Sequence, residues 1–392
     1  MTRFAHLGDL HIGSSHLSYR AADGRNQRTV DFEQAALIAA RQAVASNIDF
    51  AVIAGDTLDE TNMMPGPLSG AVKLTAIFAQ AGVPLLVIGG NHDEPEAIGR
   101  YSALKFLAEH NEVQLYLEQT AVDLAGVRLH MVPYRVLSRA QRGRGELLPF
   151  AFAEDRPNIL VAHGYAPGEG VPEIPEGMET VIPAEWLSDP RFKICLLGHI
   201  HHHGKIAAGV FYSGSVERRN FGECQEEPGF WIHEIAADGS VSSESVLISD
   251  LDEAKEVNLP RPMASHSLDT ANLTPDQVDR QVNRLLEATP TGAMVRIVLD
   301  NVSDSLGPEY RKQWQRKHRD NGGLYLDVTV HNRRASELLA VDFAEPPEDI
   351  SQGLLEFIGG QEMTADRDEV VALASDLISE ARDFVLVQDG GE

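Results

Sequence analysis

Five short polar segments combine glycine with aspartate, asparagine or histidine, and each follows a run of apolar residues. In chain order they are residues 8–11 (GDLH), 55–59 (GDTLD), 90–93 (GNHD), 163–164 (HG) and 198–201 (GHIH). Nitrogen and oxygen donors without thiolate suit divalent Mn, Fe, Ni or Zn better than Ca or Mg, which prefer oxygen ligands. The segments therefore predict a site for divalent Mn, Fe, Ni or Zn.

The segments offer more ligands than one ion needs. Seven donors are too many for a single tetrahedral ion, but they suit two ions that share a bridging carboxylate. Two metal ions about 3.5–4 Å apart can activate a water molecule and clamp the oxygens of an in-line phosphoryl displacement. The chemistry predicted from these residue types is hydrolysis of a phosphate ester.

The elements that position these segments are alternating strands and helices. The apolar runs predict strands at 3–7, 50–54 and 85–88, and the amphipathic stretches predict helices at 31–46, 68–81 and 96–107. This alternation is typical of βαβ units in an α/β fold. Ligands bind outside the carboxyl ends of the strands in such sheets, and the glycines allow close approach of backbone and metal. The polar segments are expected at one sheet edge.

Beyond residue 112 the sequence predicts mainly strands. They are expected at 113–117, 127–132, 158–162, 192–197, 210–213, 230–235 and 241–246. Two prolines at 260 and 262 predict a domain boundary. A small α+β unit follows, with helices at 274–288 and 309–317 and strands at 293–299 and 323–331. The expected domains are residues 1–255, residues 260–334, and an acidic segment 335–392 with an amphipathic helix at 366–385.

The composition is that of a globular protein with an acidic balance. The 392 residues carry a formal net charge of −26, and residues 337–392 contribute half of it. Such a charge taken alone argues against nucleic-acid binding, which usually needs a basic face. Two cysteines, Cys195 and Cys224, indicate a reducing compartment. The apolar runs are too short to cross a membrane and no signal peptide is evident, so a cytoplasmic location without membrane contact is expected.

The order of the five segments resembles the calcineurin-like metallophosphoesterase superfamily. The resemblance implies a four-layer α/β/β/α core and two divalent metal ions. It assigns Asp9, His11, Asp56 and His201 to the first metal, with Asp56 bridging. Asn91, His163 and His199 would complete the second site. His92 would lie over the phosphate as an acid or charge stabiliser, with the Asp59 carboxylate as its orienting partner; some nucleases of the superfamily carry histidine at that position.

Within the superfamily the chain resembles the SbcD-type DNA repair nucleases. The N-terminal motif at 4–13 and the stretch 212–223 (YSGSVERRNFGE) carry this resemblance, together with a small unit after the core. It implies Mn-dependent exonuclease and endonuclease action on DNA. It also implies a partnership with an SbcC-type SMC-like ATPase, with a homodimer of this chain inside a heterotetramer. The apolar stripe at 366–385 could dock the ATPase coiled coil or pack on its own domain, and both alternatives remain open.

DNA binding by so acidic a chain would depend on local clusters of basic residues. One cluster lies in a loop, a second lies near the site, and a third lies on or just past a short helix. The candidates are Arg135, Arg139, Arg142 and Arg144; Arg218 and Arg219; and Arg311, Lys312, Arg316, Lys317 and Arg319. Each cluster could equally be solvated surface.

Two other functions fit parts of the sequence. A small-molecule phosphodiesterase or phosphatase, such as a cyclic-nucleotide enzyme, would share nearly all the metal motifs but leave residues after 260 without a role. A non-catalytic scaffold is disfavoured because all seven ligand positions and His92 are filled. The segment at 204–205 lacks the features of a P-loop, and no serine nucleophile elbow is present. His202 and His203 are expected to support the site or to face solvent, and Asp93 is expected to form hydrogen bonds in its loop; none of the three is expected to bind metal.

Overall fold

Strands whose residues alternate between two apolar environments form the centre of the molecule. In β2 (Phe50–Ile53), Phe50 and Val52 contact one hydrophobic cluster, while Ala51 and Ile53 contact another. Successive side chains of a strand point to opposite faces, so a strand that is apolar throughout must be covered on both sides. All four residues of β2 are buried, as the apolar run predicts.

The computed structural model describes residues 1–332, apart from residues 18, 22, 62, 95–101, 111–112, 176 and 303–305. The predicted segment 335–392, with its helix at 366–385, lies outside the described residues. So does the first half of the helix expected at 96–107.

The first sheet has six strands in the order β12-β11-β1-β2-β3-β4. Its strands are β1 (Thr2–Leu7), β2, β3 (Leu85–Ile88), β4 (Gln114–Tyr116), β11 (Gly229–Ile235) and β12 (Val241–Leu247). Strands β1 to β4 are parallel, and β11 joins β1 in the antiparallel sense. The carboxyl ends of β1, β2 and β3 therefore meet at one edge.

The second sheet also has six strands, in the order β5-β6-β7-β8-β10-β9. Its strands are β5 (Thr120–Leu124), β6 (Val127–Val132), β7 (Asn158–His163), β8 (Phe192–Gly198), β9 (Gly204–Ala207) and β10 (Val210–Tyr212). Strands β6, β7, β8 and β10 run parallel to one another, whereas β5 and β9 are antiparallel at the edges. Strands β5 and β9 were not predicted from the sequence.

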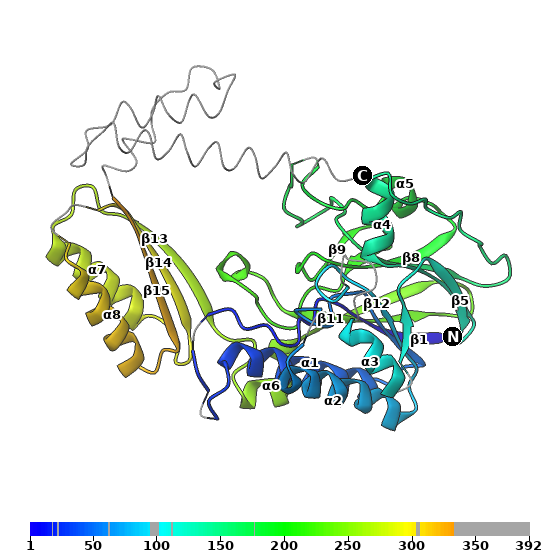
Figure 1. Cartoon of the computed structure of the whole chain (residues 1–392), viewed down its shortest axis with the longest axis horizontal. Coiled ribbons are helices and arrows are strands. Elements are labelled where there is room, and N and C mark those ends of the chain that lie inside the picture. Colours follow the sequence, from blue (N-terminus) through cyan, green and yellow to red (C-terminus); the bar gives the residue numbers. More distant parts are fainter. Residues whose placement is uncertain are drawn as a thin grey trace, which may run out of the picture. The chain divides into compact units, whose positions relative to one another are not determined.

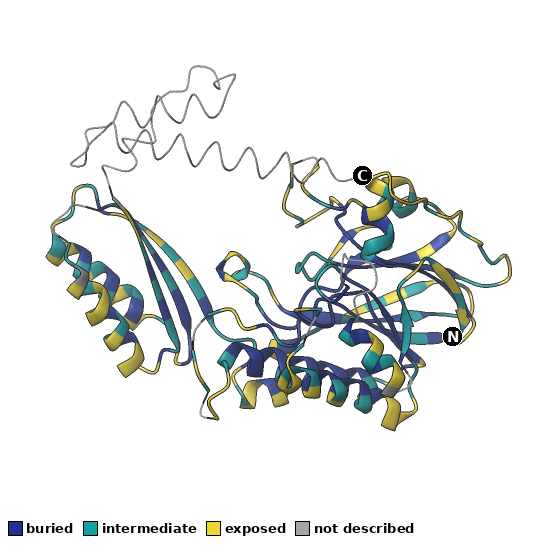
Figure 2. Ribbon diagram, viewed as in Figure 1, coloured by how far each residue is buried: buried dark blue, intermediate teal, exposed yellow. Residues whose placement is uncertain are grey.

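Helices cover the outer face of each sheet, so the core has four layers (Figure 1). The first sheet packs on α1 (Gln27–Ala45), α2 (Pro65–Ala81) and α3 (Ala103–His110). A second apolar cluster fills the space between the sheets, and a third lies beneath α4 (Tyr134–Gln141) and α5 (Ala184–Leu187). Figure 2 shows the strands as the most deeply buried part of the molecule. The predicted α/β/β/α architecture is confirmed.

A separate three-stranded sheet follows, in the order β13-β14-β15. It consists of β13 (Met263–Asp269), β14 (Met294–Val302) and β15 (Tyr325–Asn332), with α7 (Pro275–Glu287) and α8 (Pro308–Asp320) along one face. This sheet has its own apolar core, which includes the buried Trp314 of α8. Helix α7 begins at a capping box formed by Thr274 and Gln277. Since residues Met1–His331 form one compact unit, the division at 255–260 remains a prediction.

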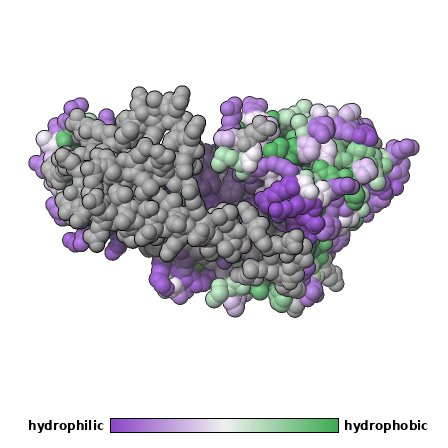
Figure 3. All heavy atoms as spheres, turned by 45° about the horizontal axis from the view of Figure 1, so that its top comes forward, coloured by the Kyte–Doolittle hydropathy of each residue, from purple (hydrophilic) through white to green (hydrophobic). Residues whose placement is uncertain are grey.

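The remaining short elements are α6 (Asp252–Glu256) and two 3-10 turns, η1 (Phe221–Glu223) and η2 (Ile248–Asp250). None of the helices in the described part of the chain is both long and apolar enough to span a lipid bilayer. The described surface seen in Figure 3 is mostly hydrophilic, and hydrophobic residues form small separate areas on it.

Candidate two-metal site

The seven predicted ligands follow strands of both sheets at the same end of the core. Asp9 and His11 follow β1, Asp56 follows β2 and Asn91 follows β3. From the second sheet come His163 at the end of β7, and His199 and His201 after β8. In the described residues, three groups place donor atoms within 4.8 Å of one another: Asp9, His11 and His201; His11, Asp56 and His92; and Asp9, Asp56 and His163.

The backbone at several of these residues adopts a conformation that L-residues rarely use. Asp9, His11, Asp56 and His199 all have positive φ, at 49°, 41°, 50° and 102°. Each such residue costs on the order of 1–3 kcal/mol and persists only where the surroundings impose it. Gly90 has no room for a side chain, because a Cβ there would collide with Asp56. The strained backbone turns donor atoms toward one point.

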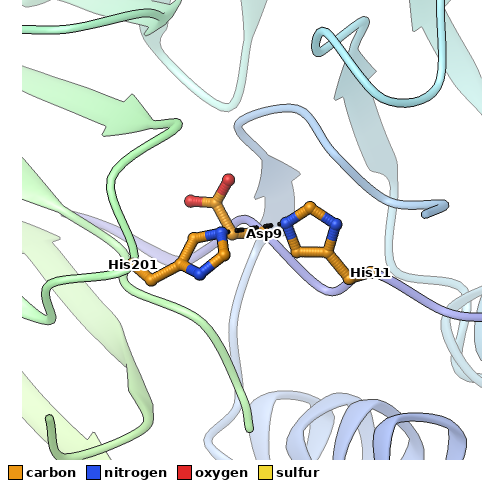
Figure 4. Close-up of side chains that lie close together, drawn as sticks. All are labelled: Asp9, His11 and His201. Carbon is orange, nitrogen blue, oxygen red and sulfur yellow. Dashed lines mark hydrogen bonds between the residues drawn. The ribbon is translucent and has the colours of Figure 1, made fainter. Parts of the chain in front are cut away.

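His11 and His201 form the first half of the site, and one nitrogen of each ring points toward the other ring (Figure 4). Their Nε2 atoms are 3.0 Å apart. On the outer side, His11 Nδ1 lies 3.1 Å from Asp59 Oδ1 and His201 Nδ1 lies 3.0 Å from Glu223 Oε1. A carboxylate only accepts hydrogen bonds, so each Nδ1 carries a proton and each Nε2 is turned inward. A cation bound between the two rings would take the place of any proton shared by the Nε2 atoms.

His163, His199 and Asn91 form the second half in the same way. His163 Nδ1 donates to the backbone carbonyl of Ala54 at 2.7 Å, which leaves Nε2 directed at Asn91 Oδ1, 3.0 Å away. His199 Nε2 donates to Glu179 at 2.8 Å, and its Nδ1 lies 3.0 Å from the same Asn91 oxygen. One nitrogen of each ring and the Asn91 oxygen therefore converge on one point.

Asp9 and Asp56 lie between the two halves. Both oxygens of Asp9 accept from the backbone N–H of His199 at 3.0 Å. Asp56 Oδ2 lies 3.4 Å from His163 Nε2 and 3.8 Å from His11 Nε2, so it faces both halves, as a bridging carboxylate must. Burial would raise the pKa of Asp56, but His163 and His11 hold that pKa well below its ordinary value. Burial would lower the pKa of His163, yet Asp56 and Asp9 raise it to about 9.

The donor set therefore fits two divalent cations. Each histidine turns one nitrogen inward, from which a bound cation would displace any proton, while a carboxylate or carbonyl fixes the other nitrogen, the arrangement usual for metal-binding histidines. The carboxylates attract positive charge to the space between the rings. Asp9, His11, Asp56 and His201 would hold one ion, and Asp56, Asn91, His163 and His199 the other.

His92 lies beside this cluster, and its ring is held by a different kind of partner. Its backbone N–H donates to Asp56 Oδ1 at 2.8 Å, and its Nδ1 donates to the backbone carbonyl of Asp59 at 2.9 Å. In the structure, the contact of Asp59 with the His92 ring comes from the backbone carbonyl and not from the expected carboxylate. That carboxylate turns instead toward His11 and toward Arg219, 3.0 Å away, because both offer N–H donors on its inner side.

Arg219 reaches the site from the loop after β10. One terminal nitrogen of its guanidinium lies 3.2 Å from His92 Nε2, and the other makes the contact with Asp59. The sequence identified Arg219 only as a candidate DNA contact. Its position places a fixed positive charge next to His92, at the mouth of the site.

The cleft above the metal ligands has a volume of about 510 Å³. Pro172 and Ile174 form part of one wall, and the segment from Asn220 to Glu226 contributes to its lining as well. Asp56, Asn91, His92, His199, His201 and Arg219 are among its lining residues. A phosphate group that enters this cleft would meet the ligands, His92 and Arg219 together.

Three polar residues next to the motifs support the site in the described structure. Asp93 accepts from the backbone N–H groups of Thr57 and Gly90, both at 2.7 Å, and burial together with the Asp56 charge raises its pKa to about 8. His202 pairs with Glu226 at 3.0 Å. His203 donates to the Ser213 carbonyl at 2.6 Å. None of the three belongs to the groups of described residues whose donor atoms converge.

The other candidate DNA contacts are spread over several elements. Arg135 and Arg139 lie on helix α4 and not in the expected loop, because the turns after Pro133 are helical and bury Leu137 and Ser138. Arg135 pairs with Glu94 and Glu118, and Arg218 donates to the carbonyls of Glu226 and Arg261. Arg311 donates to the Val328 carbonyl. Arg139, Lys312, Arg316 and Arg319 are exposed.

Sequence reasoning missed the two glutamates that support the site. Glu223 lies inside the stretch 212–223 that carries the family resemblance, but no role was given to it. Glu179 belongs to a stretch rich in proline and glycine, where no spacing pattern identifies it. Both act by fixing a histidine that follows β8, a relationship that only the folded chain brings together.

Comparison with known proteins relates this chain to a phosphoesterase family. The profile of the family described as calcineurin-like phosphoesterase matches residues 2–203. The DNA double-strand break repair protein Mre11 of Archaeoglobus fulgidus is 27% identical over 57% of this chain and 52% of its own length. The D subunit of the nuclease SbcCD of Staphylococcus saprophyticus is 25% identical over 48% of this chain and 55% of its own length. The chain thus spans about half the length of these two relatives.

A third relative extends over nearly the whole chain. The DNA double-strand break repair protein Mre11 of Haloferax volcanii is 25% identical over 98% of this chain and 80% of its own length. This match reaches past residue 203 into the third sheet.

Proposed function

Because the chain belongs to the calcineurin-like phosphoesterase family, we propose that it is a DNA nuclease of double-strand break repair that hydrolyses phosphodiesters with two Mn²⁺ ions. The observation that carries the phosphodiesterase chemistry is the convergence of histidine nitrogens on Asp9 and Asp56 beside His92. The names of the three relatives support DNA as the substrate.

Two divalent ions in this site would supply Lewis-acid activation of water and neutralise charge on the phosphate. The chain's own residues would orient the reaction around them. The backbone carbonyl of Asp59 fixes the ring of His92, whose Nε2 faces the cleft beside Arg219. His92 would then assist departure of the leaving oxygen, and the Arg219 guanidinium would bind a non-bridging phosphate oxygen.

The third sheet supports DNA over a small phosphoester. A cyclic nucleotide would fill the cleft and leave α8 without a role. Helix α8 carries Lys312, Arg316 and Arg319, which are exposed and can contact a phosphate backbone. The net charge of −26 predicts weak binding to DNA by the rest of the chain, so a partner would hold the duplex.

We propose an SbcC-type SMC-like ATPase as that partner, with the chain acting as a homodimer inside a heterotetramer. The acidic segment 335–392 would provide the docking helix at 366–385. Truncation after residue 334 should then abolish co-purification with the ATPase while the metal site stays intact. Unchanged co-purification would mean that docking uses another surface.

The decisive experiment incubates the protein with Mn²⁺ and end-labelled linear duplex DNA, with Asp56→Asn and His92→Ala as controls. We expect degradation by the unaltered protein and little by either variant. Cleavage of cyclic nucleotides without cleavage of DNA would identify a small-molecule phosphodiesterase instead. Inactivity on every phosphoester, despite bound Mn²⁺, would favour a scaffold.

A further inference from the structure

The segment between β10 and β11 supplies two side chains to the site. Arg219 contacts His92 and Asp59, as described above. Glu223, further along the same segment, holds His201 Nδ1 at 3.0 Å and also accepts from the Arg219 backbone N–H at 2.6 Å. The Glu223 carboxylate therefore ties the segment to itself and to a metal ligand.

Phe221 lies between these two residues and packs away from the site. Only 3% of it is exposed, and it clusters with Met263 of β13 and Met294 of β14. Its ring centroid lies 6.4 Å from that of Tyr325 on β15, and the Arg296 guanidinium lies 4.6 Å from the ring centroid. All three strands of the third sheet thus contact one aromatic ring from the site segment.

A second anchor fixes the start of the segment. Glu217 is fully buried and accepts from the backbone N–H groups of Arg218 and Arg261, both at 2.8 Å. The Arg28 guanidinium lies 3.4 Å from Glu217 and 2.9 Å from Asp31, which also pairs with Arg261 at 2.9 Å. Beyond this network, Phe221 is the large apolar side chain that holds the middle of the segment.

On the basis of the two-metal site of the proposed function, we infer that Phe221 is a positioning residue through which the third sheet holds Glu223 on His201 and Arg219 on His92. Without the ring, η1 loses its apolar anchor while its backbone stays tethered at Glu217. Glu223 and Arg219 would then sample other orientations. The third sheet would thus form part of the support of the metal site, in addition to any contact with substrate.

Phe221 should affect the binding of only one of the two ions. Glu223 supports His201, a predicted ligand of the first ion. The histidines of the second ion are supported by the Ala54 carbonyl and by Glu179, and neither belongs to the segment from 217 to 224. Loss of Phe221 should therefore weaken binding of the first ion and leave the second unchanged.

The test is a Mn²⁺ titration of the full chain, in which electron paramagnetic resonance measures free Mn²⁺ and resolves two classes of site. Glu223→Ala marks the class that contains His201, and Glu179→Ala marks the class that contains His199. Loss of such a supporting group typically lowers metal affinity 10–100-fold. We expect Phe221→Ala to weaken Mn²⁺ binding at the class that contains His201, the Glu223 class, about tenfold or more. The conservative Phe221→Leu should retain most of that affinity.

A double variant of Phe221 and Glu223 distinguishes a positioning role of Phe221 from a general loss of stability. If Phe221 acts through Glu223, the double variant Phe221→Ala/Glu223→Ala should bind Mn²⁺ no more weakly than Glu223→Ala alone, because coupled residues are not additive. Leu286→Ala in the core beneath α7 is the matched control: it should lower the thermal midpoint of the metal-free protein and leave both Mn²⁺ classes intact.

Three results would overturn the inference: an unaltered Glu223 class in Phe221→Ala, equal weakening of both classes, or simple additivity in the double variant. Because the titration uses no substrate, its outcome is independent of the proposed nuclease activity. A chain that binds two Mn²⁺ ions but leaves DNA intact would sink the nuclease proposal alone. A chain that cuts DNA but binds Mn²⁺ unchanged in Phe221→Ala would sink this inference alone.

Discussion

Asp59 acts on His11 with its carboxylate and on His92 with its backbone carbonyl. Oδ1 lies 3.1 Å from His11 Nδ1, while the carbonyl oxygen lies 2.9 Å from His92 Nδ1. One residue thus positions a predicted metal ligand with its side chain and the proposed leaving-group residue with its main chain. Substitution of the side chain should separate these two roles, because the carbonyl remains in every variant.

Asp59→Ala should weaken Mn²⁺ binding at the His11 site by about 10–100-fold. The neutral Asp59→Asn should cost less, since its amide oxygen still accepts the His11 Nδ1 hydrogen. At saturating Mn²⁺, the turnover rate of both variants should return to most of the rate of the unaltered protein. Measuring rate against Mn²⁺ concentration tests this. A lower maximal rate with unchanged Mn²⁺ dependence would indicate that the carboxylate acts on His92 after all.

His92→Asn should show the opposite separation. Removal of a group that assists proton transfer costs about 10²–10⁴-fold in kcat. Mn²⁺ binding should change little, because the His11, His163, His199 and His201 rings keep their supports. Parallel measurements of kcat and of bound Mn²⁺ decide the matter, with His16→Asn as a control on an exposed histidine. A loss of bound Mn²⁺ comparable to the loss of kcat would make His92 a ligand.

Metal removal should lower thermal stability. Bound cations would offset the charge of the buried carboxylates, and a ligand at 100 times its Kd stabilises a folded protein by about 2.7 kcal/mol. Differential scanning calorimetry with Mn²⁺ and with EDTA measures the shift in Tm. The Asp56→Asn variant should show a much smaller shift. Equal shifts in both proteins would place the stabilising ion elsewhere.

A buried histidine between the sheets should make the fold sensitive to acid. Burial is the main cause that lowers the pKa of His6 from 6.5 to about 3, although its ring contacts the Leu197 carbonyl. Between those values the unfolded chain binds a proton that the folded chain does not, so stability falls as the pH drops from 6.5 toward 3. At pH 5 the loss from His6 amounts to about 2 kcal/mol.

His6→Asn keeps an N–H donor and cannot titrate. Its free energy of unfolding in urea should be lower than that of the unaltered protein at pH 7.5, but should fall less between pH 7.5 and pH 5. His16→Asn provides the control for an exposed position. Parallel pH profiles for the unaltered protein and His6→Asn would contradict the prediction.

Substitution on α8 should test DNA contact by the third sheet. Lys312→Glu should weaken binding to duplex DNA for all sequences alike, and should reduce the steepness of the salt dependence by roughly one phosphate contact. Fluorescence anisotropy in EDTA measures binding without cleavage. Lys255→Glu on α6 makes the same charge change at another exposed position. Equal effects of the two substitutions would mean that only net charge matters.

Apolar periodicity was sufficient to predict the two main sheets, since their central strands β2, β3 and β7 are buried on both faces. β13 was missed because its sequence, MASHSLD, alternates small and polar residues with few apolar ones. Its partner β14 and the ring of Phe221 supply the burial that its own composition does not indicate. Helix α4 was missed because it is short and its apolar face carries few residues.

The candidate ligands could be predicted because each ends or follows a strand. The carboxyl ends of neighbouring parallel strands lie at the same edge of a sheet. The supports of those ligands could not be predicted. Glu179 meets His199 across 20 residues and Glu223 meets His201 across 22, without a spacing rule. The direction of Asp59 depends on competition between His11, His92 and Arg219 for one carboxylate, which is decided by side-chain packing.

The origin of the ligands in two different sheets has a mechanical consequence. Asp9, His11, Asp56 and Asn91 follow strands of one sheet, and His163, His199 and His201 follow strands of the other. Any ion bound by both sets would link the two sheets at the edge where these strands end. Separation of the sheets would then require the ions to leave first, so the rate of metal release would limit how fast the folded core comes apart under chelation.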